Sequence, residues 1–178
     1  MIDLTKRGLP NVVEINGRLF SVYTDFRVWM RFEIAVSKLK PGERLNISYL
    51  FKNEMPVYCD LRELFAFSRP FSPLPRSVSH SDVVAFDYEL DADYIYSAFK
   101  GQYGIDLVDV EELHWHKFLA LFKGLKDDEI LCKIMGYRCY EKTETKKDVY
   151  AELRKQWEIE RVSEEEQAEI EEFSRLFS

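Results

Sequence analysis

The chain has few residues of several kinds, and each shortage excludes a class of protein. Its three cysteines, Cys59, Cys132 and Cys139, are odd in number and widely spaced. They do not form a disulfide framework, and we expect reduced thiols in a cytoplasm. No apolar run approaches the length of a membrane span, and the N-terminal segment lacks the apolar core of a signal peptide. We therefore expect an intracellular protein without a membrane association.

Basic residues are also outnumbered, with 25 Lys and Arg against 32 Asp and Glu, which gives a net charge of −7. Binding to phosphates needs a basic surface, so this balance argues against nucleic acid and anionic lipid as partners. The chain contains no P-loop, no Gly-x-Gly-x-x-Gly and no Gly-x-Ser-x-Gly motif. These absences favour a protein that is not an enzyme and needs no cofactor.

Aromatic residues are abundant instead, with thirteen Phe and ten Tyr among 178 residues. They are concentrated at helical spacing in the stretch from Phe86 to Leu125, which contains no arrangement of side chains suited to catalysis. Large apolar rings without catalytic partners suggest a protein that holds surfaces together. The composition and spacing alone predict a helical domain.

The N-terminal third predicts a hairpin followed by helices. Asn16-Gly17 separates two short apolar segments, and this dipeptide favours a two-residue turn because both positions need positive φ. Thr24 is a candidate N-cap for a helix over residues 25–40, which ends before Pro41.

Two further helices are expected in the N-terminal half, over about residues 43–52 and 60–67. Residues 69–81 hold three prolines and four serines and predict a loop inside the domain.

The second half predicts five helices. One covers about residues 92–102, and a longer one begins at an N-cap on Asp106 and continues to Leu125. Another follows Asp127. Beyond Cys139 the chain has seven basic and twelve acidic residues. We expect one charged helix there around Val149, Leu153 and Trp157, and a last one after a capping box that starts at Ser163.

The overall prediction is a mainly α fold: a compact helical domain over residues 1–138 with a small N-terminal β-hairpin, and a charged helical C-terminal extension over residues 139–178.

Two groups of polar residues are candidates for a chemical site. Glu111 and His114 form a Glu-x-x-His pair, which supplies two ligands in di-iron bundles, but a second pair is missing and no zinc spacing is present. We expect one histidine at the core edge and one in solvent. Acidic residues also alternate through the run Asp87, Glu89, Asp91 and Asp93. This run lacks the glycine and glutamate of a calcium loop and is better read as an acidic approach to a helix N-terminus.

Aromatic residues admit a second interpretation. The tyrosines around Phe99 could stack on bases, although core packing fits better without a basic setting. Trp157 lies in a highly charged segment, so it is either a docking residue or part of a core.

Four blocks of sequence together resemble one phage family. In this chain the blocks are LPNVVEINGRLFSVYTDFRVWMRFE (9–33), FDYELDADYIYSAFKGQYGIDL (86–107), LHWHKFLALFKGL (113–125) and KIMGYR (133–138). The chain resembles the bacteriophage "gp fifteen" family of siphophages and prophages of Gram-positive bacteria. The resemblance covers about residues 9–138 and is weakest between residues 40 and 82.

The resemblance implies a role in tail assembly. Genes of this family usually lie between those of the major tail protein and the tape-measure protein, a position typical of tail-assembly chaperones. Such chaperones are largely helical, bind the tape-measure protein in the host cytoplasm, and are absent from the finished virion. The family has no agreed catalytic residues, so the resemblance implies none here.

The expected partners are therefore the tape-measure protein and other tail-assembly proteins, and an exposed hairpin edge leaves self-association open. Apolar faces that are surrounded by acidic residues are suited to binding the apolar stripe of a helical chain reversibly. The residues predicted to carry this binding are Tyr94, Phe99, Phe118, Leu121, Phe122, Leu125 and Trp157. Three alternatives stay open at this point: a structural virion component such as a tail-completion or connector protein, a metalloenzyme, and a nucleic-acid adapter.

Overall fold

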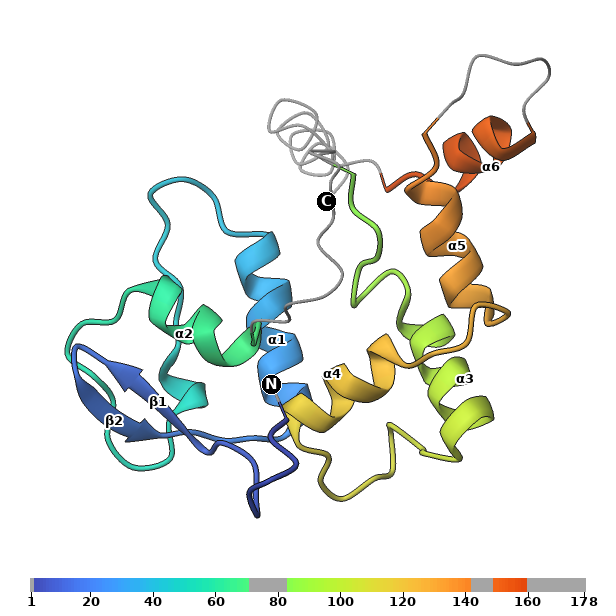
Figure 1. Cartoon of the computed structure of the whole chain (residues 1–178). Helices are drawn as coiled ribbons and strands as arrows, with labels where there is room; N and C mark the ends of the chain where they lie inside the picture. The colour runs from blue at the N-terminus through green and yellow to red at the C-terminus, as the bar shows by residue number, and fades with distance from the viewer. Residues whose placement is uncertain (1, 71–82, 142–148, 160–178) are drawn as a thin grey trace, which may run out of the picture. The chain divides into compact units, whose positions relative to one another are not determined.

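The computed structural model describes residues 2–70, 83–141 and 149–159. The chain divides into two compact units: unit 1 comprises residues 1–81 and 86–133, and unit 2 comprises residues 82–85 and 134–178. The described residues form six α-helices and one β-hairpin (Figure 1), which confirms the mainly α fold class. No helix in the described part of the chain is long and apolar enough to span a membrane.

The hairpin comes first in the chain and is followed by two helices, and the other four helices come after residue 82. Their bounds are β1 (Val12–Ile15), β2 (Arg18–Ser21), α1 (Phe26–Ser37), the 3-10 turn η1 (Ser48–Leu50), α2 (Leu61–Ser68), α3 (Ala92–Tyr103), α4 (Trp115–Lys123), α5 (Ile130–Arg138) and α6 (Val149–Trp157). The helices predicted over 60–67, over 92–102, after Asp127 and around Val149 are confirmed as α2, α3, α5 and α6. The loop predicted over 69–81 begins directly after α2, and its residues 71–81 lie outside the described residues, as does the last helix predicted after Ser163.

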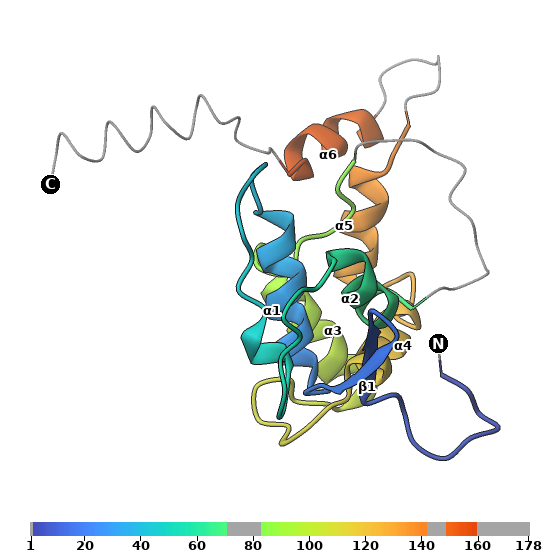
Figure 2. The ribbon, with the colours of Figure 1, turned by 90° about the vertical axis from the view of Figure 1, so that its left-hand side faces the viewer.

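The predicted hairpin is present, and its turn explains its register. Asn16 and Gly17 have φ values of 51° and 75°, the left-handed conformation that a two-residue turn requires. The antiparallel register pairs Ile15 with Arg18 and Val13 with Phe20. The inner face of the hairpin, with Val13, Ile15 and Phe20, is buried. Figure 2 views unit 1 from the side on which the hairpin and α2 lie.

The helix predicted over residues 43–52 is wrong, because only the three residues of η1 are helical there. Asn46 accepts hydrogen bonds from both the N–H and the hydroxyl of Ser48, a local alternative that competes with helix formation. The next residues bond to the end of the hairpin instead: Tyr23 donates to the Leu50 carbonyl. This segment therefore extends the hairpin rather than forming a helix.

The N-cap of α1 is Asp25 and not Thr24, so this part of the prediction is wrong. The Asp25 carboxylate accepts the Arg27 N–H at 3.0 Å through one oxygen and the Leu113 N–H at 3.2 Å through the other. The Thr24 carbonyl accepts the Trp115 N–H at 2.7 Å. Asp25 and His114 thus form an antiparallel bridge that joins the N-termini of α1 and α4, which we call the cap junction.

The long helix predicted from Asp106 to Leu125 is also wrong in its first half. Asp106 accepts the N–H groups of Val108 and Asp109, but it caps only one turn, and α4 begins at Trp115. The carbonyls of Leu107, Val108 and Val110 accept hydrogen bonds from the Arg27 guanidinium at 2.9, 3.3 and 2.8 Å. A cation from α1 satisfies these carbonyls, so the chain does not continue as a helix.

Unit 1 has an aromatic core built around Phe118 of α4. This ring is fully buried and stacks on Phe26 of α1 at 5.1 Å, on Phe99 of α3 at 5.0 Å and on Trp115 at 5.5 Å between ring centroids. A second stack joins Trp29 to Phe67 of α2 at 4.4 Å. Aromatic packing therefore ties α4 to both α1 and α3, and Figure 1 shows α4 between these two helices.

The core tryptophans also satisfy their indole N–H groups. Trp29 donates to the Tyr23 carbonyl at 2.7 Å, and Trp115 donates to the Ser68 carbonyl at 2.8 Å. Since a buried donor without a partner would be costly, these bonds fix the orientation of each indole as well as its burial.

Unit 2 is organised around Arg138, the last residue of α5. Its guanidinium donates to the Trp157 carbonyl at 2.7 Å and to the Ala85 carbonyl at 3.2 Å. Arg154 of α6 donates to the Tyr140 carbonyl at 3.0 Å, and the Tyr150 ring lies 5.4 Å from that of Tyr140. These contacts attach α6 to the end of α5. The proposed domain boundary at residue 138 stays a prediction.

Asp25→Ala tests the cap junction. The change removes the cap of α1 and the partner of the Leu113 N–H, so we expect a loss of about 2–3 kcal/mol in the free energy of unfolding, measured by urea denaturation. Asp3→Ala is the matched control, because Asp3 also accepts a local N–H bond, from Thr5, but is exposed. A loss in Asp25→Ala no larger than in Asp3→Ala would contradict the role of the junction.

Candidate functional site

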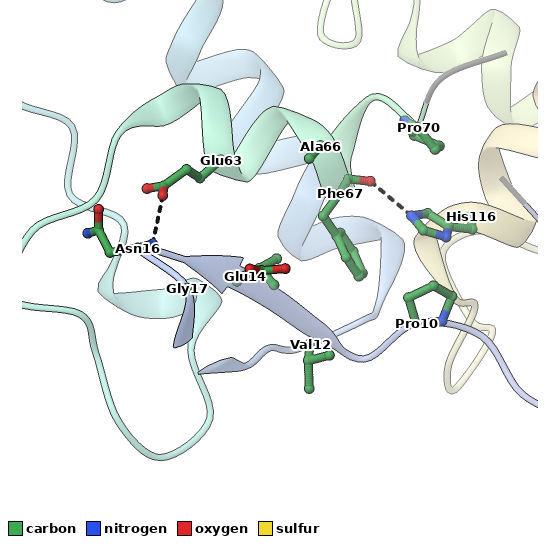
Figure 3. Close-up of a pocket in the computed structure, with 11 residues that line it drawn as sticks. Pro10, Val12, Glu14, Asn16, Gly17, Glu63, Ala66, Phe67, Pro70 and His116 are labelled. Atoms are coloured by element: carbon green, nitrogen blue, oxygen red, sulfur yellow. Dashed lines mark hydrogen bonds between the residues drawn. The ribbon is translucent and has the colours of Figure 1, made fainter. Parts of the chain in front are cut away.

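An open groove lies between β1 and α2 in unit 1, with a volume of about 470 Å³. Apolar side chains form most of its wall, and Figure 3 shows α2 on one side and β1 on the other. The groove is lined by Pro10, Val12, Val13, Glu14, Asn16, Gly17, Glu63, Ala66, Phe67, Pro70 and His116. Its floor includes Phe67, whose ring packs on Trp29 in the core.

Glu63 joins the hairpin turn to the first turn of α2 at one end of the groove. One carboxylate oxygen accepts the N–H of Asn16 at 2.8 Å (Figure 3), and the other accepts the N–H of Asp60 at 3.2 Å. Asp60 in turn accepts the Arg62 N–H, so Glu63 completes a capping box. A single carboxylate thereby fixes the position of the turn relative to the helix.

Two histidines hold the other end. The Nε2 of His116 lies 2.9 Å from the Phe67 carbonyl, and the Nε2 of His114 lies 2.9 Å from the Pro10 carbonyl. A carbonyl only accepts, so both Nε2 atoms carry the proton in the neutral rings. The Nδ1 of His114 is then an acceptor and receives the His116 N–H at 3.0 Å, which caps α4.

Both histidines are held in the neutral form. Burial lowers the pKa of His114, although its bond to the Pro10 carbonyl acts in the opposite direction. Burial likewise lowers the pKa of His116, against the effect of the Phe67 carbonyl. The Nδ1 of His116 is buried and has no hydrogen-bond partner among the described residues. Protonation would place a charge there without an acceptor.

The groove is acidic as well as apolar. Glu14 and Glu63 are its charged residues, and none of the residues that line it is Lys or Arg. With both histidines neutral near pH 7, no positive charge among the residues that line the groove neutralises the two carboxylates. Such a surface suits an apolar ligand that also carries positive charge.

Three of the seven predicted binding residues lie in the core, and the other four are half-buried. Phe99 and Phe118 are fully buried, and Leu125 is 9% exposed, so none of the three offers a surface to another protein in this structure. Leu121, Phe122 and Tyr94 are half-buried, and the Phe122 ring lies 4.9 Å from that of Phe86. Trp157 is half-buried in unit 2. The three buried residues are not available at the surface of unit 1, and the role of all seven in binding stays a prediction.

The two groups of polar residues considered as chemical sites, the Glu111–His114 pair and the acidic run 87–93, lie at the starts of helices or in solvent. His114 caps α4 while Glu111 is exposed, and the described residues contain no group of three side chains suited to holding a metal. In the acidic run, Asp91 is buried at the N-cap of α3 and accepts the Asp87 N–H at 2.9 Å. The run therefore leads into a helix N-terminus, as predicted.

Sequence reasoning missed the groove because its walls come from segments about 50 residues apart. Two local signals were nevertheless present. Asn16-Gly17 predicted the hairpin, and Asp60 followed by Glu63 matches a capping box at the start of α2. Nothing in the sequence indicated that the same glutamate would also bind the hairpin turn.

Lower pH should destabilise the fold through the two histidines. Their pKa values are lower in the folded chain than the unfolded value of about 6.5. The unfolded state therefore binds more protons, and their contribution to stability is present above pH 6.5 and is lost as pH falls below it. We expect the free energy of unfolding to decrease from pH 7.5 to pH 5.5 in urea denaturation.

The double variant His114→Asn, His116→Gln is the control, since it retains a capping oxygen and a donor but does not titrate. Its free energy of unfolding should change less over the same pH range. An equal slope in the variant and the unchanged protein would show that other groups cause the dependence.

The chain was compared with known protein families, curated proteins and solved structures. Residues 6–160 match the family described as Bacteriophage Gp15 protein, which includes both β1 and α2 and therefore the whole groove. No curated protein and no solved structure matches the chain. Because the match covers most of the 178 residues, the chain belongs to the bacteriophage Gp15 family.

Proposed function

We propose that this chain is a tail-assembly chaperone that binds the phage tape-measure protein while the tail is built. It acts in the cytoplasm of the bacterial host and leaves before the virion is complete. Membership of the Gp15 family supports a structural or assembly role in a phage. Our proposal adds that the chain binds the tape-measure protein, a long and partly apolar helical chain.

The observation that carries the proposal is the open groove between β1 and α2. A groove of about 470 Å³ with a largely apolar wall and two carboxylates fits a segment of another polypeptide. It is built on a hairpin and a helix that Glu63 fixes together, so the surface exists before a partner arrives. A preformed surface loses little conformational entropy on binding.

Exposed apolar side chains add to this surface. Leu19 on β2 is 64% exposed, and Tyr58, whose carbonyl accepts a bond from the Asn16 side chain, is 70% exposed. Met55 and Val57 in the same segment are also exposed. None of these four residues lines the groove, but they lie on the hairpin and on the segment bonded to its turn, and exposed apolar residues of this kind are typical of protein-binding surfaces.

The net charge of the chain is consistent with a protein that covers an apolar surface of its partner reversibly. A net charge of −7 keeps copies of the chaperone apart and in solution, while the apolar groove covers a stripe of the partner. Release needs no chemical step, because the contacts are non-covalent and individually weak. The partner can then pass to the growing tail.

Co-expression with the tape-measure protein of the same phage tests the function. The chain should increase the soluble fraction of the tape-measure protein and co-purify with it. Ala66→Arg places a long side chain in the groove at an exposed position of α2, and should weaken binding about tenfold in a titration.

Ala120→Arg is the matched control, since Ala120 is an exposed alanine of α4 that does not line the groove. It should bind as the unchanged chain does. Absence of co-purification would contradict the proposal. Stoichiometric amounts of the chain in purified virions, measured by mass spectrometry, would instead indicate a structural virion component.

A further inference from the structure

The backbone of β1 presents unpaired hydrogen-bonding groups along the groove. Ile15 and Arg18 flank the two-residue turn, so they form a hydrogen-bonded pair, and Val13 with Phe20 is the next such pair. The bond from the Val22 N–H to the Asn11 carbonyl continues this alternation. The odd-numbered residues of β1 therefore bond to β2, and the even-numbered ones direct their N–H and C=O groups outward.

Both ends of this outward edge are occupied. The Pro10 carbonyl accepts from the His114 ring at 2.9 Å, and the Asn16 N–H donates to Glu63 at 2.8 Å. Between them lie the N–H and C=O groups of Val12 and Glu14, for which the described residues supply no hydrogen-bond partner. Two donors and two acceptors at strand spacing thus face a groove that is open to another chain.

The side chains around this edge differ between the two faces of the strand. Val13 is buried on the face that packs toward α2 and Phe67, so a residue placed opposite Val13 would meet an apolar wall. Glu14 is exposed on the other face and lies opposite Leu19 on β2. The described residues place no cation within ion-pair distance of Glu14.

We propose that the outer edge of β1 binds an extended segment of a partner protein as an antiparallel third strand. The pairing uses the N–H and C=O groups of Val12 and Glu14. The segment carries a basic residue opposite Glu14, followed by an apolar residue opposite Val13. Backbone bonds supply affinity in such strand addition, and the alternating side chains supply specificity.

This inference rests on the proposed function, because it describes the part of the partner that the groove binds. It also names a different kind of segment from the helix expected of a tape-measure chain: an extended one with a basic-apolar pattern. A region of the partner that lies between its helices has the backbone groups that this edge requires.

A peptide titration tests the inference without the partner protein. The probe is acetyl-Gly-Ser-Lys-Val-Val-Ser-Gly-amide, and the reference peptide has Glu in place of Lys. The ¹⁵N-labelled full chain is titrated with each and followed by two-dimensional NMR. We expect the amide signals of Val12 and Glu14 to shift most, and the Lys peptide to bind about fivefold more tightly than the Glu peptide.

Two proline variants separate the edge from the rest of the hairpin. Glu14→Pro removes both an outward N–H and the Glu14 carboxylate on β1 without removing a bond to β2, and should weaken the Lys peptide at least fivefold. Leu19→Pro removes the outward N–H at the cross-strand partner on β2 and should leave binding unchanged. Equal losses in both variants would contradict the assigned edge, and the NMR shifts of the unchanged chain give the same answer if a variant does not fold.

Other outcomes would contradict the inference about the strand edge and leave the proposed function unaffected. If neither peptide shifts Val12 and Glu14, or if both bind equally, the edge does not recognise this segment, although the tape-measure protein could still co-purify. If these two signals shift with the concentration of the chain alone, the edge pairs between copies instead. If the peptide binds but the tape-measure protein does not co-purify, the inferred edge stands and its partner is another protein.

Discussion

The fold of unit 1 depends on the cap junction at Asp25 and His114, where two helices begin side by side. The Phe26 N–H donates to the Leu113 carbonyl at 2.8 Å, and the Trp115 N–H donates to the Thr24 carbonyl at 2.7 Å. Each of the two residues at the centre also caps its own helix. Segments separated by 88 residues are thus joined through groups that a helix end leaves unsatisfied.

The junction has consequences for the groove. The His114 ring that caps α4 also binds the Pro10 carbonyl, so the start of the hairpin is attached to the same point. Next to it, His116 binds the end of α2 through the Phe67 carbonyl. The hairpin and α2 are held at one end by these histidines and at the other by Glu63. The groove keeps its shape because both of its walls are fixed at two points.

Particular residues show what the sequence could predict. The Asn16-Gly17 turn and the helices with complete local signals, such as α3, were predictable because neighbouring residues determine them. The helix expected from Asp106 failed because the distant Arg27 binds the carbonyls that the helix would have used. Phe99 and Phe118 were predicted as binding residues from their spacing, yet spacing does not distinguish a buried face from an exposed one, and here both are buried. The groove arises only when β1 and α2 meet.

An aromatic core and an unpaired edge of β1 beside an acidic groove are the physical basis for the proposed binding of extended chain segments. Amide hydrogen exchange measured by NMR tests this account most directly. We expect the amides of Phe26, Leu113 and Trp115 to exchange only through global unfolding, while those of Val12 and Glu14 exchange rapidly in the chain alone and slowly when a partner segment is bound. Slow exchange at Val12 and Glu14 in the monomeric chain alone would contradict the account, since the edge would then already be paired.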